Sequence, residues 1–258
     1  MRRLLPFLLL ALVAPLAARA QTPDIVPPVA APAVLPATAF YEIMTPKGRM
    51  VVRLFDETPL HRDNFKRLVA TGYYDSTAFH RIIEGFVVQG GDPTTRDADP
   101  MNDGNGDPGY TVPAEFGFPH LRGALAAARQ PDEMNPAQAS SGSQFYLVTG
   151  RLANDAWLDE ARARIRATTN DSTFDWAPDL IERYKTQGGV PFLDRQYTVF
   201  GEVVEGLDVL MTLETADTPR RQRLPPSEFS DRPFERLWIA VRPLDFYTPP
   251  VATPAAGQ

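Results

Sequence analysis

The chain has 258 residues, 43% of them hydrophobic and 22% charged, a balance typical of one globular domain with additional segments. It contains no cysteine, which excludes disulfide bonds, thiolate catalysis and thiolate-ligated metal sites. Its formal net charge of −6 argues against a protein that binds nucleic acid through a general positive field.

The first twenty residues have the pattern of a secretory signal peptide. Arg2 and Arg3 form a basic start, residues 4–18 are apolar, and Ala18-Arg19-Ala20 is a small-residue cleavage site before Gln21. The alternative is an uncleaved membrane anchor, but a span needs about 20 consecutive apolar residues and this run is shorter. We therefore expect an exported protein, periplasmic or secreted, with residues 1–20 removed.

Proline-rich segments flank the predicted domain. Residues 21–38 are rich in Pro, Ala and Val, which predicts an extended linker, and the tail over 248–258 has a similar composition. The folded domain is therefore predicted over residues 39–247.

The domain is predicted to begin with a β-hairpin over 40–55, because two β-rich runs are separated by polar turn residues. Thr58-Pro59 predicts the start of a helix over 58–71, with Thr58 as N-cap and Pro59 at the first helical position. Short strands and turns then dominate, and they favour an antiparallel barrel or sandwich. Further strands are predicted at 78–83, 86–89, 110–112, 123–128, 144–149, 197–203 and 237–241, and a second helix at 205–213.

Residues 151–191 interrupt this pattern with two helical periodicities. Asn154 can cap the first helix, and Pro178 begins the second, which Gly188-Gly189 ends. We interpret this segment as a helical hairpin inserted into a β domain.

The stretch FHRIIEGFVVQGGD is apolar except for a few polar residues, among them Arg81 and Gln89. A hairpin centred on Gly85 would place Arg81 directly opposite Gln89, on one face of the sheet. Such a patch could hydrogen-bond a carbonyl beside an apolar ring. The alternative is a strand arginine paired with a carboxylate such as Glu84 or Glu115.

The same stretch resembles the central motif F-H-R-x-I-x-x-F-x-x-Q-G-G-D of the cyclophilin family of peptidyl-prolyl cis/trans isomerases. Three later segments resemble further family motifs in the same order: GALAAAR at 123–129, SQFY at 143–146 and LDRQYTVFG at 193–201. The resemblance implies an eight-stranded antiparallel barrel capped by two helices, at 58–71 and 204–214. It also implies a shallow surface groove that binds a peptide across its proline.

The resemblance assigns roles to individual residues. Arg81 matches the catalytic arginine, Phe86 the aromatic floor of the proline pocket, and Gln89 the amide that holds the substrate backbone. The implied substrate-binding residues are Ala127, Ala128 and Arg129 on an edge strand, Gln144 and Tyr146 in the groove, and Phe192, Leu193 and Tyr197 on the far wall.

Four of these positions depart from common family residues, and a fifth varies within the family. Ala127 stands where Met is frequent, which predicts a roomier pocket, and Arg129 stands where many members have Asn. Tyr146 replaces a usual Phe, Tyr197 replaces a common His, and Phe192 occupies a position that holds Trp or Phe. None of these departures removes the Arg81, Phe86 and Gln89 set.

Rotation about an X-Pro bond breaks no covalent bond, so the implied activity needs no nucleophile, metal or cofactor. We expect proline-containing peptides and unfolded proteins as partners, no nucleic acid, and a monomer. His80 is an alternative acid or base, but a structural histidine on the opposite strand face is the simpler expectation. The loop Asp97–Asp107 invites a calcium interpretation, yet it does not fit the EF-hand register.

Three functions remain open on the sequence alone. The first is an exported prolyl isomerase, the second a proline-peptide binding module or chaperone with little catalysis, and the third a carbohydrate- or ligand-binding barrel. The intact Arg81, Phe86 and Gln89 set favours the enzyme.

Overall fold

The computed structural model describes residues 38–97, 99–227 and 229–248. The predicted signal peptide, all but the last residue of the predicted linker, and residues 249–258 lie outside this part of the chain.

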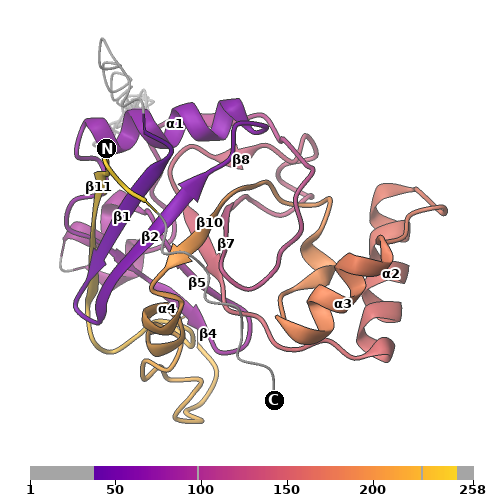
Figure 1. Cartoon of the computed structure of the whole chain (residues 1–258). Coiled ribbons are helices and arrows are strands. Elements are labelled where there is room, and N and C mark those ends of the chain that lie inside the picture. The colour runs from indigo at the N-terminus through magenta and orange to yellow at the C-terminus, as the bar shows by residue number, and fades with distance from the viewer. Residues whose placement is uncertain (1–37, 98, 228, 249–258) are drawn as a thin grey trace, which may run out of the picture.

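A single antiparallel sheet forms the body of the molecule (Figure 1). Its order is β3-β11-β1-β2-β10-β7-β9-β5-β4. The strands are β1 (Phe40–Thr45), β2 (Gly48–Leu54), β3 (Thr77–Phe79), β4 (Arg81–Ile83), β5 (Val87–Gly90), β7 (Ala124–Ala127), β9 (Phe145–Val148), β10 (Val199–Glu205) and β11 (Leu237–Pro243). A separate pair joins β6 (Thr111–Val112) and β8 (Ser140–Ser141).

The sheet closes into a barrel through one interrupted strand. β3 and β4 stand at opposite ends of the sheet order, yet only His80 separates them in the chain. The backbone N–H of His80 donates to the Gln89 carbonyl at 3.0 Å, so pairing with β5 continues across the interruption. Counted as one strand, β3 and β4 complete the eight-stranded antiparallel barrel that the resemblance implies.

Two helices cap the ends of the barrel, as predicted: α1 (Pro59–Ala70) and α4 (Leu207–Leu213) (Figure 1). They close the barrel because each turns an apolar face inward. Phe65 of α1 and Leu210 of α4 are 1% and 0% exposed and join the same core as Leu147 of β9. Burying a side chain of this size stabilises the fold by about 1.5–3 kcal/mol.

Helix α1 begins as predicted, with Thr58 at the N-cap position and Pro59 as the first helical residue, but the Thr58 side chain makes no capping hydrogen bond. Instead, the Glu115 carboxylate accepts hydrogen bonds from the backbone N–H groups of Leu60 and His61, each at 3.0 Å. A carboxylate at this end satisfies unpaired N–H groups and complements the helix dipole. Local sequence patterns do not predict this contact, because Glu115 is far from α1 in the chain.

Residues 151–191 contain the predicted helical hairpin, which projects from one side of the barrel (Figure 1). It comprises α2 (Asp155–Thr169) and α3 (Pro178–Thr186). The Asn154 side chain accepts a hydrogen bond from the Trp157 backbone N–H at 2.9 Å, as a cap does. The hairpin buries its own apolar cluster against the barrel residue Leu121; this cluster contains Leu158, Ala161, Ile165, Trp176 and Tyr184.

Gly189 joins the hairpin to the barrel and must be glycine. Its φ is +156°, and a Cβ there would lie 2.4 Å from the His120 carbonyl oxygen. This close approach lets the Gly189 backbone pair with both Leu121 and Arg151.

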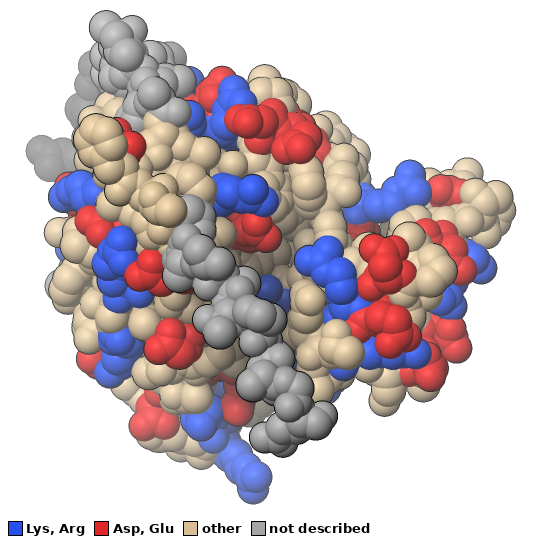
Figure 2. All heavy atoms as spheres, viewed as in Figure 1, with Lys and Arg blue, Asp and Glu red and all other residues tan. Residues whose placement is uncertain are grey.

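Basic and acidic side chains are interspersed over both the barrel and the hairpin on the face shown in Figure 2. In the part of the chain that the structure describes, no helix combines the length and apolarity that a membrane crossing requires.

Candidate functional site

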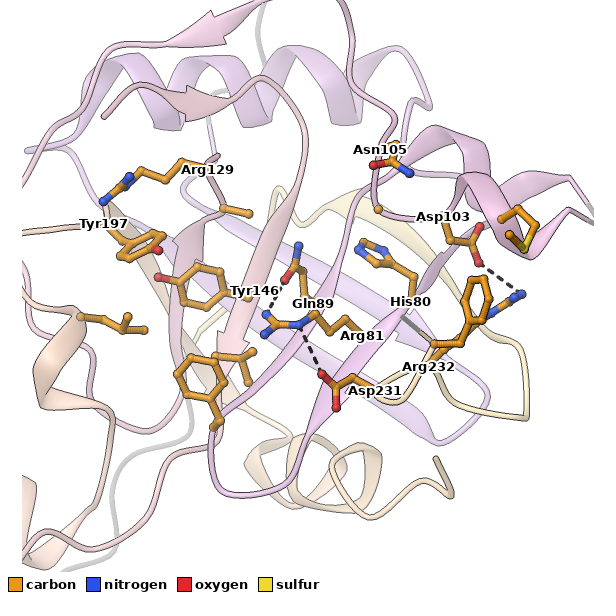
Figure 3. A pocket seen from close by; sticks show the side chains of 17 residues that line it. His80, Arg81, Gln89, Asp103, Asn105, Arg129, Tyr146, Tyr197, Asp231 and Arg232 are labelled. Carbon is orange, nitrogen blue, oxygen red and sulfur yellow. Dashed lines mark hydrogen bonds and ion pairs between the residues drawn. The ribbon is translucent and has the colours of Figure 1, made fainter. Parts of the chain in front are cut away.

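The predicted hairpin around Gly85 is present with the predicted register. Arg81 pairs with Gln89, and Ile83 pairs with Val87. Gly85 supplies a positive φ of +68° at the turn, a conformation that L side chains rarely adopt. The Arg81 Nη1 donates to the Gln89 Oε1 at 3.1 Å, so these two side chains meet on one face (Figure 3).

A cavity of about 460 Å³ opens over this face (Figure 3). Its volume is within the usual range of small-ligand sites. Most of the predicted site residues line it: Arg81, Phe86, Gln89, Ala128, Arg129, Tyr146, Leu193 and Tyr197.

The other three predicted residues lie beside the cavity rather than in its lining. Phe192 stacks on Phe86, with ring centroids 5.9 Å apart and planes at 15°. Ala127 points into the barrel core, because strand alternation puts Ala126 and Ala128 on the cavity side. The prediction that the small side chain of Ala127 makes the pocket roomier is therefore wrong for this cavity.

Gln144 orients the Gln89 side chain through a hydrogen bond. The Gln144 Oε1 accepts from the Gln89 Nε2 at 3.1 Å, while the Gln144 Nε2 donates to the carbonyls of Gly104 and Gly106 at 2.9 and 2.8 Å. The two backbone carbonyls orient one amide, which orients the next. Gln89 thereby presents its oxygen to Arg81, and the guanidinium is held in one direction.

Neither carboxylate considered as an alternative partner neutralises Arg81. Glu84 pairs with Arg221 at 2.6 Å, and Glu115 caps α1. The nearest carboxylate belongs to Asp231, whose Oδ2 lies 3.8 Å from the Arg81 Nε. The Arg81 side chain is 41% exposed, so its donors remain available to a ligand in the cavity.

Asp231 lies in a cavity wall that sequence analysis missed. This wall comes from two irregular loops that carry no periodic pattern. The Asp231 carbonyl accepts a hydrogen bond from the Ile82 backbone N–H at 2.7 Å, which fixes one of these loops to β4. The missed lining residues are Met101, Asp103, Gly104, Asn105, Phe229, Asp231 and Arg232.

His80 also lines the cavity, contrary to the expectation that it would point to the opposite strand face. It occupies the interruption between β3 and β4, where the alternation of a continuous strand does not apply. The residue is 8% exposed, and neither ring nitrogen has a hydrogen-bond partner among the described residues. Burial lowers the His80 pKa to about 4, so the ring is neutral near pH 7.

The far wall is fixed by the buried carboxylate of Asp194. Its Oδ1 accepts from the backbone N–H and the Nδ1 of His120 at 2.8 and 3.0 Å. Its Oδ2 accepts from the Trp176 Nε1 at 2.8 Å and the Tyr184 hydroxyl at 2.7 Å. In the neutral imidazole, the His120 Nε2 then accepts from the Tyr146 hydroxyl, 3.0 Å away.

This network connects the inserted hairpin to the cavity wall. Trp176 and Tyr184 belong to the insertion, whereas Tyr146 lines the cavity. Burial raises the pKa of the Tyr146 hydroxyl well above its usual value, so the hydroxyl stays protonated and can donate. No local sequence pattern indicates this network because its members are far apart in the chain.

Arg129 supports the same wall through Tyr197. Its guanidinium lies 4.5 Å from the Tyr197 ring centroid, and its Nε donates to the Gln196 carbonyl at 2.8 Å. Its side chain is only 3% exposed. Arg129 therefore acts as a support for an aromatic wall rather than as a free charge in the cavity.

Within residues 38–97, 99–227 and 229–248, no group of three or more His, Asp or Glu side chains is arranged to hold a metal ion. In the acidic loop, the Asp97 and Asp99 side chains accept hydrogen bonds from nearby backbone N–H groups, and Asp103 pairs with Arg232 at 3.2 Å. These contacts stabilise the loop as a series of turns.

Comparison with known proteins agrees with this geometry. The family model described as "Cyclophilin type peptidyl-prolyl cis-trans isomerase/CLD" matches residues 40–229. A Staphylococcus epidermidis protein that carries the name of a peptidyl-prolyl cis-trans isomerase is 35% identical over 169 residues, which cover 64% of this chain and 76% of that protein. A Staphylococcus aureus protein with the same name is 33% identical over 165 residues, covering 63% and 74%.

Among solved structures, a cyclophilin-type peptidyl-prolyl cis-trans isomerase of Cryptosporidium parvum is similar to this chain with a TM-score of 0.52 and 25% identity. The similarity covers 78% of this chain and 96% of that one, which was solved in the presence of the dipeptide Ala-Pro.

We predict that His80 makes the protein less stable as the pH falls. Its pKa is about 4 in the folded state, against about 6.5 in an unfolded chain, so between these values only the unfolded state binds the proton. Stability should therefore fall as the pH drops from about 6.5 to about 4, by on the order of 3 kcal/mol from this group. Urea unfolding across this window measures the loss, and His80→Gln should make it smaller. An equal loss in His80→Gln would contradict a neutral, buried His80.

We also predict that the hydrogen bonds to Asp194 stabilise the whole domain. Tyr184→Phe leaves a buried carboxylate one donor short, which should lower the free energy of unfolding by about 1.5–3 kcal/mol. Trp176→Phe should have at least this effect, whereas Trp157→Phe, on the same hairpin but packed under Arg151, should have much less. Denaturant unfolding compares the three variants. Equal losses for the two tryptophan variants would show that hairpin packing, and not the carboxylate, accounts for the effect.

Proposed function

The chain belongs to the cyclophilin-type peptidyl-prolyl cis-trans isomerases, and from that premise we propose that Arg81 assists the rotation of X-Pro bonds in exported proteins. The observation that supports this most directly is the convergence of Arg81, Gln89 and Phe86 on one cavity. They offer a charged donor, an oriented amide and an apolar ring, and these are the groups that a rotation without bond cleavage can use.

The chemical task is to lower a torsional barrier. An X-Pro bond rotates over about 18–20 kcal/mol because its C–N bond has partial double-bond character, and uncatalysed exchange takes tens to hundreds of seconds. A group that favours a pyramidal proline nitrogen, or that holds the carbonyl through its rotation, lowers this barrier.

Arg81 suits this task because a guanidinium stays protonated and presents planar donors. The oriented amide of Gln89 holds it at 3.1 Å, and its Cζ lies 5.9 Å from the Phe86 ring centroid. A proline ring lying on Phe86 would therefore have its imide group close to the guanidinium. Fixed donors of this kind need little reorganisation as the charge distribution changes.

Proline-containing peptides are the proposed ligands, and unfolded proteins that display such segments are the proposed clients. The Cryptosporidium parvum relative solved in the presence of Ala-Pro supports this ligand class. The exposed fraction of Arg81 and the open cavity are compatible with a flexible peptide that enters from solvent.

We propose export on the sequence pattern of residues 1–20, which lie outside the described residues. The prediction is that the mature protein begins at Gln21, because Ala18-Arg19-Ala20 is a cleavage site of small residues. Mass spectrometry of the protein recovered from the culture medium or periplasm gives the answer. A chain that retains residues 1–20 would instead indicate an anchor.

We predict that Arg81→Ala lowers kcat/KM for a proline peptide by about a hundredfold, since a preorganised charged donor contributes about 3 kcal/mol to a transition state. The melting temperature should change little, because the side chain is partly exposed. A protease-coupled assay on an Ala-Pro peptide measures the rate. Arg221→Gln is a matched control, because it removes an arginine that is paired with Glu84, a residue of the β4–β5 hairpin that also carries Arg81.

Two results would overturn the proposal. A folded Arg81→Ala variant with most of its activity would exclude the assisting role of the guanidinium. A wild-type protein that binds the peptide without accelerating its isomerisation would be a binding module and not an enzyme.

A further inference from the structure

The inserted hairpin places a second arginine next to the proposed proline site. The Arg164 guanidinium on α2 lies 4.7 Å from the ring centroid of Phe192. Phe192 stacks on Phe86, which in turn lies 5.9 Å from the Arg81 guanidinium. Arg164 is therefore connected through two aromatic rings to the floor of the cavity.

The charge of Arg164 is available to a ligand. Its side chain is exposed, and among the described residues no carboxylate oxygen lies within 4.0 Å of its guanidinium. Other arginines around this region are paired: Arg162 with Asp175 and Arg195 with Asp171, each at 2.8 Å. Arg164 is held by its contact with the Phe192 ring, an interaction that leaves its hydrogen-bond donors unused.

The position of Arg164 relative to the cavity is fixed by the packing of α2. The next residue, Ile165, is 0% exposed in the hairpin cluster, so this face of the helix cannot rotate. The hairpin itself is joined to the barrel by the hydrogen bonds of Trp176 and Tyr184 to Asp194. The stretch of α2 that carries Arg164 is thus anchored by buried contacts.

The contacts of Phe192 with Arg164 and with Phe86 set an upper limit on the distance between Arg164 and a proline bound on Phe86. The ring separations place the Arg164 Cζ no more than about 11 Å from the Phe86 centroid, a span of about three residues of extended chain. We propose that Arg164 is a specificity-determining residue that selects proline segments carrying Asp or Glu within three residues of the proline. This inference rests on the proposed function, because it requires the proline to lie on Phe86.

The expected preference is modest and depends on salt. An ion pair at an exposed rim changes a binding equilibrium by about two- to fivefold. Added salt shortens the Debye length from about 30 Å at 0.01 M to about 3 Å at 1 M and should remove most of this preference.

The test uses Ala-Pro peptides with Glu, Gln or Lys placed one, two or three residues from the proline, on either side. The wild-type protein should give a kcat/KM that is about two- to fivefold higher for Glu than for Lys at one or more positions at low salt. Arg164→Gln should bring this ratio close to one. Arg183→Gln is the matched control, because it removes an equal charge from an exposed position on α3 and should retain the ratio.

Binding of the same peptides, monitored by nuclear magnetic resonance, separates the proposed isomerase function from the proposed role of Arg164. If the wild-type protein binds the peptides but does not catalyse, the proposed function fails and the Glu-to-Lys ratio of affinities still tests Arg164. No charge preference in either rate or binding would overturn the inference about Arg164. So would an equal loss of preference in Arg164→Gln and Arg183→Gln, because this would attribute the effect to net charge alone.

Discussion

The carboxylate of Asp194 is the point at which the barrel, the inserted hairpin and the cavity wall are held together. A buried carboxylate costs several kcal/mol in desolvation unless donors surround it. Here each oxygen accepts two hydrogen bonds, from the backbone and ring of His120 on one side and from Trp176 and Tyr184 on the other. The cost of burying this charge is therefore offset only when the hairpin is docked on the barrel.

From Asp194 the constraint extends to the cavity through His120 and Tyr146. The Tyr146 ring packs edge-on against Tyr197, with centroids 6.1 Å apart, and Tyr197 lies under the Arg129 guanidinium. The opposite wall is fixed by a separate chain of hydrogen bonds. Backbone carbonyls bind the Gln144 amide, which binds the Gln89 amide, which accepts from Arg81. Two rigid walls thus enclose the apolar surface of Phe86. Such a site suits a rotation that breaks no bond, because positioning and electrostatics are all that the protein can contribute.

Local features of this structure could be predicted from the sequence because they depend on neighbouring residues. The register of Arg81 with Gln89 follows from strand alternation around Gly85, and the helix starts follow from Pro59, Asn154 and Pro178. The resemblance to the family motifs predicted the barrel and most of the cavity lining, because these motifs contain the strands that form both.

The remaining features depend on contacts between distant residues, which leave no periodic signal. The Glu115 carboxylate, rather than the Thr58 side chain, accepts hydrogen bonds at the start of α1 because the fold brings it to the helix terminus, and no local pattern indicates that approach. Asp231 reaches Arg81 from an irregular loop, and His80 faces the cavity because it interrupts a strand. In each case the tertiary arrangement, and not the local preference, determines where the side chain lies.

The position of the insertion decides what it can do. Closing a longer surface loop costs little entropy, about 0.6 kcal/mol for each doubling of its length, so the barrel could carry an insertion at many loops. This one enters beside Phe192 and is fixed by Asp194, and both residues flank Leu193 of the cavity wall. On the proposed function, a substrate that fills only the cavity would meet the barrel residues, whereas a longer chain that reaches Arg164 would also meet α2. The dependence on substrate sequence should therefore increase with the length of chain that is bound.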